Sequence, residues 1–195
     1  MQSFSQLALT CIKKPLLEVI HGFNNKTMYN SCIKWNISIL PLTNIVHFFS
    51  QQQGISNIKF ILYEPIISPN TTIFYTNSMD GLIGIIEKRA VLLNWEIFYL
   101  SIHNNDGEYY NSFHFYRIFG NLKRKILCYQ DPHWTFYQQG EPLSFEDIER
   151  YSLKPIKKRL DYSLIIQYFK HNNWDIENES FWKPKGCVYL FEQIY

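Results

Sequence analysis

The stretch SFHFYRIFGNLKRKILCYQDPHWTFYQQG, residues 112–140, decides the expected fold. SFHFYRIF and LKRKILCY alternate between polar and apolar residues, as half-buried strands do. Gly120-Asn121 separates them and is a candidate for a two-residue hairpin turn. QDPH provides a second turn before WTFYQQG. The pattern therefore predicts an antiparallel meander of three strands.

The chain before this meander predicts a strand, a helix and another strand. NIKFILYEPI (57–66), TIFYTN (72–77) and WEIFYLSI (95–102) are rich in the β-branched and aromatic residues typical of strands. Between the last two, SMDGLIGIIEKRAVLLNW has apolar residues at helical spacing, with Ser78 as a candidate N-cap and Asp80 in the first turn. Two strands joined through a helix by short connections predict a right-handed parallel βαβ unit.

The two ends of the chain give weaker and different patterns. SQLALTCIKKPLLEVI has apolar residues at helical spacing that Pro15 interrupts, CIKWNISILP alternates like a strand, and Thr43 to Gly54 predicts a short helix. After the meander we expect an extended and then helical link, a helix in DYSLIIQYFKHNNW, and a last strand in GCVYLFEQIY.

These elements predict one α+β domain over residues 1–195, whose core lies in 56–195 and whose N-terminal part, 1–55, is the least defined. The expected sheet is mixed, with the βαβ unit followed by the antiparallel meander and with flanking helices. A chain of 195 residues with 46% hydrophobic and 18% charged residues has enough apolar side chains for such a core.

The charge balance argues against nucleic acid as a direct partner. The formal net charge is +2, and a nucleic-acid-binding domain usually carries a stronger basic footprint. The densest basic stretches are NLKRK (121–125) and KPIKKR (154–159), which we interpret as a solvated turn and a solvated helix start.

The cysteines and the N-terminus predict a cytoplasmic protein. The four cysteines, at positions 11, 32, 128 and 187, form no CxxC pair, so free thiols are expected. The N-terminus lacks the basic and apolar regions of a signal peptide. No run approaches the roughly 18 apolar residues of a membrane span.

Residues that would carry chemistry are scattered. Cys128 and His133 could face each other across the QDPH turn, but Cys128 follows an apolar run and is better interpreted as packing. Asp80-Gly81 and Gly84 could hold an anion at a helix start, with capping and close packing as the alternative. No two histidines lie at metal-ligand spacing. We therefore predict no catalytic residue, no metal site and no cofactor.

Part of the chain resembles a known class of proteins. The residues WTFYQQGEPLSFED (134–147), Tyr151, KKRL (157–160), LIIQYFKHNNWDI (164–176) and the helix entry YTNSMDG carry the resemblance. They resemble small bacterial proteins encoded beside polymorphic toxins of the Rhs and contact-dependent inhibition type, which are regarded as immunity proteins. The resemblance covers roughly residues 56–182. It implies a protein that binds a cognate toxin domain and blocks its active site or assembly, and it carries over no catalytic residue.

Acidic and aromatic side chains in two stretches are the candidates for contacts with such a toxin, because charge complementarity speeds association and tyrosines are frequent in interfaces. The first stretch contains Asp106, Glu108, Tyr109 and Tyr110, and the second contains Glu141, Glu146, Asp147 and Glu149. Two alternatives stay open: a small cytoplasmic nuclease or hydrolase that uses His133 with nearby carboxylates, and an accessory protein of a phage or mobile element. The sequence leaves the oligomeric state open.

Overall fold

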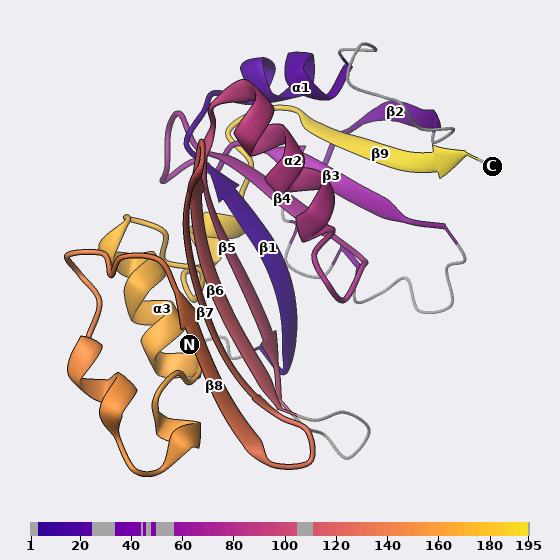
Figure 1. Ribbon diagram of the computed structural model, residues 1–195. Coiled ribbons are helices and arrows are strands. Elements are labelled where there is room, and N and C mark those ends of the chain that lie inside the picture. Colours follow the sequence, from indigo (N-terminus) through magenta and orange to yellow (C-terminus); the bar gives the residue numbers. More distant parts are fainter. Residues whose placement is uncertain are drawn as a thin grey trace.

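The computed structural model describes residues 4–24, 34–43, 45, 48–49, 57–104 and 111–194. Figure 1 shows the elements that these residues form. In chain order they are β1 (Gln6–Ile12), α1 (Leu16–Asn24), β2 (Lys34–Leu40), β3 (Lys59–Tyr63), β4 (Thr72–Thr76), α2 (Ile83–Leu93), β5 (Glu96–His103), β6 (Ser112–Phe119), β7 (Leu122–Gln130), β8 (Trp134–Gln139), the 3-10 helices η2 (Ile148–Ser152) and η3 (Ile156–Lys158), α3 (Tyr162–His171), the 3-10 helix η4 (Glu179–Trp182) and β9 (Val188–Ile194).

The described strands form one nine-stranded sheet in the order β2-β9-β3-β4-β1-β5-β6-β7-β8. Every pairing between described neighbours in this sheet is antiparallel. The α+β class predicted from the sequence is confirmed. The predicted mixed sheet with a parallel βαβ unit is wrong, because β4 and β5, which α2 connects, are not neighbours.

The strand that separates β4 from β5 is β1, from the part of the sequence interpreted as a broken helix. Leu9 lies opposite Tyr75 of β4 on one side and opposite Leu100 of β5 on the other, and its side chain is fully buried. Six of the seven β1 residues are buried, in the pattern of a central strand covered on both faces. Such a strand has a continuous apolar run, which periodicity cannot distinguish from a buried helix segment.

The predicted meander is confirmed as β6, β7 and β8. Phe119 pairs with Leu122 across the two-residue turn, where Gly120 has a positive φ of 56°. The β7–β8 pairing runs from Gln130 opposite Trp134 to Lys125 opposite Gln139. Hairpins are local structures, because their turn residues and alternating strands lie next to each other in the sequence. The sequence alone therefore predicts this part of the fold.

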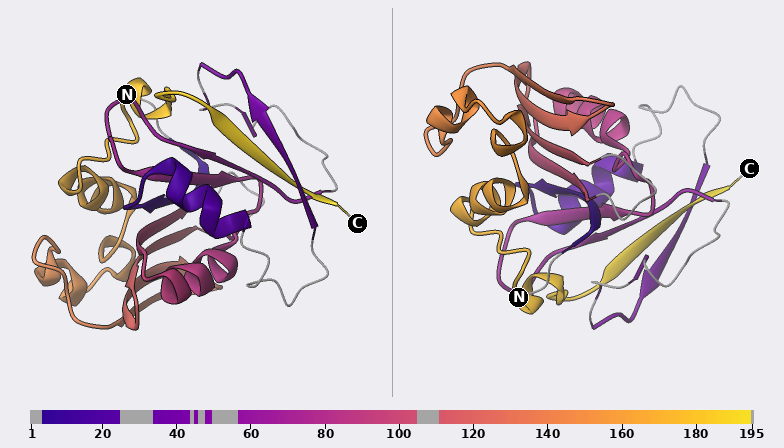
Figure 2. Two further views of the ribbon diagram at one scale, coloured as in Figure 1. Left: turned by 90° about the horizontal axis from the view of Figure 1, so that it is seen from above. Right: turned by 90° about the horizontal axis from the view of Figure 1, so that it is seen from below.

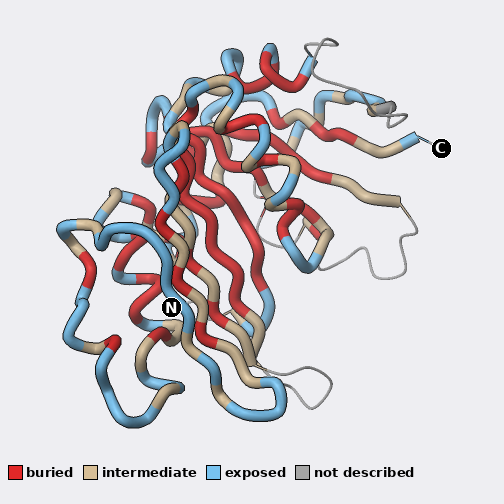
Figure 3. Tube along the Cα trace, in the orientation of Figure 1, coloured by how far each residue is buried: buried red, intermediate tan, exposed pale blue. Residues whose placement is uncertain are grey.

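Helices cover both faces of the sheet. Figure 1 shows α3 on one side of strands β5–β8 and α2 on the other, and the view from above in Figure 2 shows α1 and α2 on the same side. Leu164, Ile165, Tyr168 and Phe169 of α3 are buried in one hydrophobic cluster, as the helical pattern predicted. The second cluster holds buried residues of α1 and α2. The buried trace in Figure 3 therefore follows the central strands between these two layers.

Helix α2 begins later than the predicted N-cap Ser78. The Asp80 carboxylate accepts a hydrogen bond from the Leu82 backbone N–H at 2.9 Å, and Leu82 adopts a left-handed conformation before the helix begins at Ile83. The buried Arg89 of this helix donates to the Gly22 carbonyl of α1 at 2.7 Å, which joins the two helices.

The remaining predictions have mixed outcomes. The strand in CIKWNISILP is confirmed as β2, and the C-terminal helix and strand as α3 and β9. The link from residue 141 to 160 forms the short helices η2 and η3 instead of a longer helix. Most of the helix predicted from Thr43 to Gly54 lies outside the described residues.

Candidate functional site

The second predicted acidic stretch follows β8 and leaves the sheet at Gly140. Gly140 has a φ of 82°, a left-handed conformation that favours glycine. Glu141, Asp147 and Glu149 are exposed, whereas Glu146 is buried. Three of the four predicted acids are therefore accessible to solvent and to a partner, whereas the carboxylate of Glu146 interacts within the protein interior.

Glu146 is held by Arg124 of β7 in a buried ion pair. The side chains of Arg124 and Glu146 are 3% and 0% exposed, and their closest nitrogen and oxygen atoms are 2.6 Å apart. Arg124 Nε donates to Glu146 Oε1 at 2.9 Å, and its Nη groups also donate to the Gly140 carbonyl at 2.9 Å and to Gln138 Oε1 at 2.9 Å. One guanidinium therefore fixes the end of β8 and the segment that follows it.

Arg124 corrects the interpretation of NLKRK as a solvated turn. Alternation along β7 places Arg124 on the same face as the buried Ile126 and Cys128. Burial of the guanidinium opposes its charge, but the hydrogen bonds and the charge of Glu146 outweigh this cost, so the pKa of Arg124 is raised.

Two tyrosines extend the ion pair to helix α3. Tyr151 of η2 donates its hydroxyl to Glu146 Oε2 at 2.9 Å, and this hydroxyl lies 2.8 Å from that of Tyr168 in α3. The Tyr168 hydroxyl also accepts a hydrogen bond from the Asp147 backbone N–H at 3.0 Å. Burial raises the pKa of both tyrosines, so both stay protonated and can act as donors in this network.

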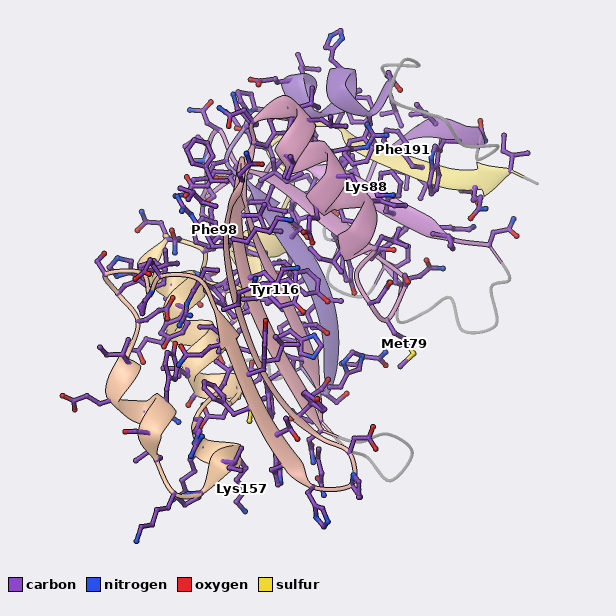
Figure 4. The ribbon with its side chains drawn as sticks, viewed as in Figure 1. Met79, Lys88, Phe98, Tyr116, Lys157 and Phe191 are labelled. Atoms are coloured by element: carbon purple, nitrogen blue, oxygen red, sulfur yellow. The ribbon has the colours of Figure 1, made fainter. Side chains whose placement is uncertain are left out.

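The buried network supports an exposed surface, which we call the 141–158 surface. It consists of the exposed apolar and charged residues of this segment: Glu141, Asp147, Ile148, Glu149, Leu153, Lys154, Lys157 and Lys158. Ile148 is 55% and Leu153 38% exposed. Figure 4 shows Lys157 at the outer end of this surface, far from α1 and α2. Exposed apolar side chains near charged ones occur often in protein-binding surfaces.

Hydrogen bonds of Arg150 fix the backbone of this surface at a second point. Arg150 donates through Nη2 to the carboxylate of Asp161 at 2.6 Å and to the Lys158 carbonyl at 2.9 Å. Asp161 in turn caps α3, because its carboxylate accepts a hydrogen bond from the Leu164 backbone N–H at 3.0 Å. Both ends of the 141–158 surface are therefore anchored to regular secondary structure.

The candidate nucleophile Cys128 has the environment of a structural thiol. It is fully buried, its Sγ donates to the Ile156 carbonyl at 3.3 Å, and burial raises its pKa to about 11. His133 is exposed in the β7–β8 turn, where its backbone carbonyl accepts from the Asp131 N–H. In the described part of the chain, no side chain forms a hydrogen bond with the His133 ring.

The other predicted sites have less support. Asp106, Glu108, Tyr109 and Tyr110 lie outside the described residues. At the start of α2, the Asp80 carboxylate occupies the position where an anion would bind, which leaves the capping alternative. Among the residues that the structure describes, no group of three or more histidine, cysteine, aspartate or glutamate side chains is placed to hold a metal ion.

Sequence reasoning did not identify a polar cluster on the face of β5 and β6 opposite to α3. Ser101 lies opposite His114, and the hydroxyls of Ser101 and Ser112 are each 3.3 Å from His103 Nδ1. Burial, with a smaller effect of His103, lowers the pKa of His114 to about 4. Burial also lowers the pKa of His103. These imidazoles are therefore neutral at pH 7.

This cluster predicts that the protein loses stability in mild acid. Because the pKa of His114 is lower in the folded chain, the unfolded chain binds more protons between about pH 4 and 6.5. The stability that neutral His114 contributes is therefore fully present above about pH 6.5 and is lost as the pH falls toward 4. We expect the free energy of unfolding in urea to be about 1–2 kcal/mol lower at pH 5 than at pH 7, after allowance for partial exposure. His114→Asn should reduce this difference, and an equal difference in both proteins would contradict the assignment.

No described helix is both long and apolar enough to cross a membrane. Compared with models of protein families, with curated proteins and with solved structures, the chain matches none.

Proposed function

We propose that this protein is an immunity-type inhibitor that acts in the cytoplasm and binds a bacterial toxin domain through the 141–158 surface. The observation that carries the proposal is the pairing of an exposed apolar and acidic surface with a buried network that holds it in place. The resemblance of residues 56–182 to immunity proteins supports the same function, and this surface lies within the resembling part.

Rigidity of the surface favours tight binding. An interface loop that is ordered only upon association costs conformational entropy, whereas a surface fixed beforehand avoids much of this cost. The ion pair of Arg124 with Glu146 and the contacts of Arg150 with Lys158 and Asp161 fix the backbone on both sides of Ile148. An inhibitor that must act before its toxin does damage gains from such preorganisation.

The charges of the surface indicate how a partner would be oriented. Asp147 and Glu149 flank the exposed Ile148, while the lysines lie further along the chain. A toxin with a basic active-site cleft would place that cleft over Asp147 and Glu149, since complementary charges speed association and fix the orientation. Ile148 would then enter the apolar centre of the interface.

Reversing the two exposed acids tests this arrangement. The double variant Asp147→Lys, Glu149→Lys is expected to bind the toxin domain about 10- to 100-fold more weakly, as two repulsive contacts of about 1 kcal/mol each would produce. The measurement is isothermal titration calorimetry with a catalytically inactive form of the candidate toxin domain, which a toxin gene directly upstream of this one would identify. Ile148→Asp should have a similar effect through loss of apolar contact.

Glu18→Lys on α1 is the matched control. Glu18 is exposed and pairs with Lys14 at 2.8 Å, so its reversal changes the charge in the same direction at a different place, by +2 where the double variant adds +4. Unchanged affinity of both 141–158 variants would exclude this surface as the interface. Absence of binding between the unmodified chain and the toxin domain would exclude the inhibitor function itself.

The enzyme alternative has a separate test. His133 is exposed and its ring has no described hydrogen-bond partner, so His133→Ala should leave folding and toxin binding unchanged. Loss of toxin neutralisation by His133→Ala with unchanged binding would favour the enzyme alternative.

A further inference from the structure

Strand β2 forms an edge of the sheet that the described chain leaves open. It pairs with β9 from Lys34 opposite Ile194 to Leu40 opposite Val188, and no described strand lies on its other side. At the opposite edge strand, β8, the short helix η3 packs against the strand, and the Arg159 guanidinium carbon lies 5.7 Å from the centre of the Phe136 ring. Figure 2 shows β2 and β9 extending from the body of the molecule, away from α3.

The middle of β2 lacks the residues that usually protect an edge strand. Natural edge strands usually carry lysines, prolines or bulges that prevent pairing with another chain. Lys34 begins this strand and Pro41 follows it, but the residues between them, WNISIL (35–40), include no charge and no proline. Ile37 is 39% and Ile39 60% exposed, and both point to the same face of the sheet. The strand therefore offers backbone hydrogen-bonding groups together with exposed apolar side chains.

A row of apolar side chains on one face of the sheet extends from the core across β3 and β9 to the edge strand β2. The rings of Phe60 and Phe191 stack with their centres 4.5 Å apart and their planes at 11°. Phe191, labelled on β9 in Figure 4, lies opposite Ile37 of β2. Phe191 is only 1% exposed, whereas Ile37, one strand further out, is 39% exposed. One additional strand beside β2 would complete the burial of this row.

We propose that a second copy of this chain supplies that strand, so that two β2 strands pair antiparallel about a two-fold axis at Ser38. This register places Ile37 opposite the partner's Ile39 and the reverse, and cross-strand pairs of β-branched residues stabilise a sheet. Such an interface uses the same surface twice, as closed dimers do. The two nine-stranded sheets would then form one continuous sheet.

The lack of charge in residues 35–40 of β2 favours a second copy over a charged partner strand. Self-pairing places every side chain opposite one from the same short segment. A charged side chain near the two-fold axis would therefore lie close to the same charge of the partner. Because residues 35–43 carry no charge, self-pairing encounters no such repulsion. For the same reason, β2 offers a charged strand of another protein no ion pair that would favour it.

Sedimentation equilibrium of the purified chain over a range of concentrations tests the inference without a toxin. We expect a mass of twice the 23.4 kDa of one chain for the unmodified protein and for Leu92→Lys. Leu92, 66% exposed on α2, is the control, because its replacement adds the same charge to another apolar surface position. Ile39→Lys should weaken association at least 10-fold, because each copy would place a lysine opposite the partner's Ile37.

Three outcomes would overturn the inference. The first is a monomeric unmodified chain at every concentration. The second is a dimer that Leu92→Lys dissociates and Ile39→Lys does not. The third is a dimer that neither substitution dissociates. If the chain is monomeric and its affinity for the toxin domain falls in Ile39→Lys, the edge is assigned to the toxin instead. Failure of toxin binding alone would affect only the proposed function, because self-association is measured on the purified chain.

A cross-link tests the register. Opposed residues in antiparallel strands have Cα atoms about 4.5–5.5 Å apart, within the range that a disulfide spans. In a background with Cys32→Ser and Cys187→Ser, the variant Ser38→Cys should form a disulfide-linked dimer under mild oxidation. The same background without Ser38→Cys is the control and should give none. A Ser38→Cys protein that stays unlinked would exclude the axis at Ser38.

Discussion

Replacing Glu146 by leucine is expected to lower the free energy of unfolding by about 3–5 kcal/mol, the cost of removing one partner of a buried ion pair. The Arg124 guanidinium, 3% exposed, would stay in the interior without its carboxylate. Tyr151 would also lose the acceptor of its hydroxyl. Urea unfolding followed by tryptophan fluorescence measures the change.

Two further variants separate charge from shape. Glu146→Gln keeps an acceptor for Arg124 and Tyr151 but removes the charge, so its loss of stability should be smaller than that of Glu146→Leu. The double variant Arg124→Met, Glu146→Leu removes both charges and should regain most of the loss, since apolar replacements of buried ion pairs are often nearly neutral. A double variant as unstable as Glu146→Leu would show that the uncompensated charge is not the cause.

The same variants separate stability from binding. If the ion pair holds the 141–158 surface, Arg124→Met with Glu146→Leu should weaken toxin binding even where the fold is retained, because the guanidinium also bonds to Gly140 and Gln138. Unchanged toxin affinity in a folded double variant would contradict the role of the ion pair in positioning that surface.

Gly140→Ala is expected to destabilise the protein by about 3 kcal/mol. This cost combines the strain of a left-handed backbone in a residue with a Cβ atom and the steric clash of that Cβ atom. A Cβ atom at position 140 would lie 2.0 Å from the Lys123 carbonyl oxygen and 3.0 Å from its carbon. Both are backbone atoms of β7, so no side-chain rotation can relieve the contact. The measurement is again urea unfolding.

Gly84→Ala is the matched control for this change. Gly84 lies in helix α2, its φ is not positive, and an added Cβ would have no heavy atom within 4 Å. Because alanine is the better helix former, Gly84→Ala should stabilise the protein by about 0.5–1 kcal/mol. Equal effects of the two substitutions would contradict the steric explanation at position 140.

Much of the fold could be read from local patterns. The β6–β7–β8 meander, helix α3 and strand β9 each have their apolar period and their turn or capping residues within a few positions of one another. The α+β class followed from these elements. In contrast, the strand β1 was interpreted as a broken helix, because a strand buried on both faces shows no alternation.

The error in β1 produced the error in topology. The sequence contains a strand, helix α2 and another strand in that order, which usually form a parallel pair. Here β1 lies between β4 and β5 and pairs antiparallel with both. Which strand lies between two others depends on contacts between residues 60 to 97 positions apart in the sequence, and no local pattern encodes it.

The candidate site divides in the same way. The sequence by itself determined that acidic residues follow β8, that they include Glu141, Asp147 and Glu149, and that Cys128 belongs to an apolar strand. Only the tertiary structure decided that Glu146 turns inward to Arg124, 22 residues away in sequence, while its neighbours face solvent. The physical reason is that a charge can be buried only where an opposite charge and further hydrogen bonds meet it. These partners of Glu146 come together only when β7, η2 and α3 pack against one another.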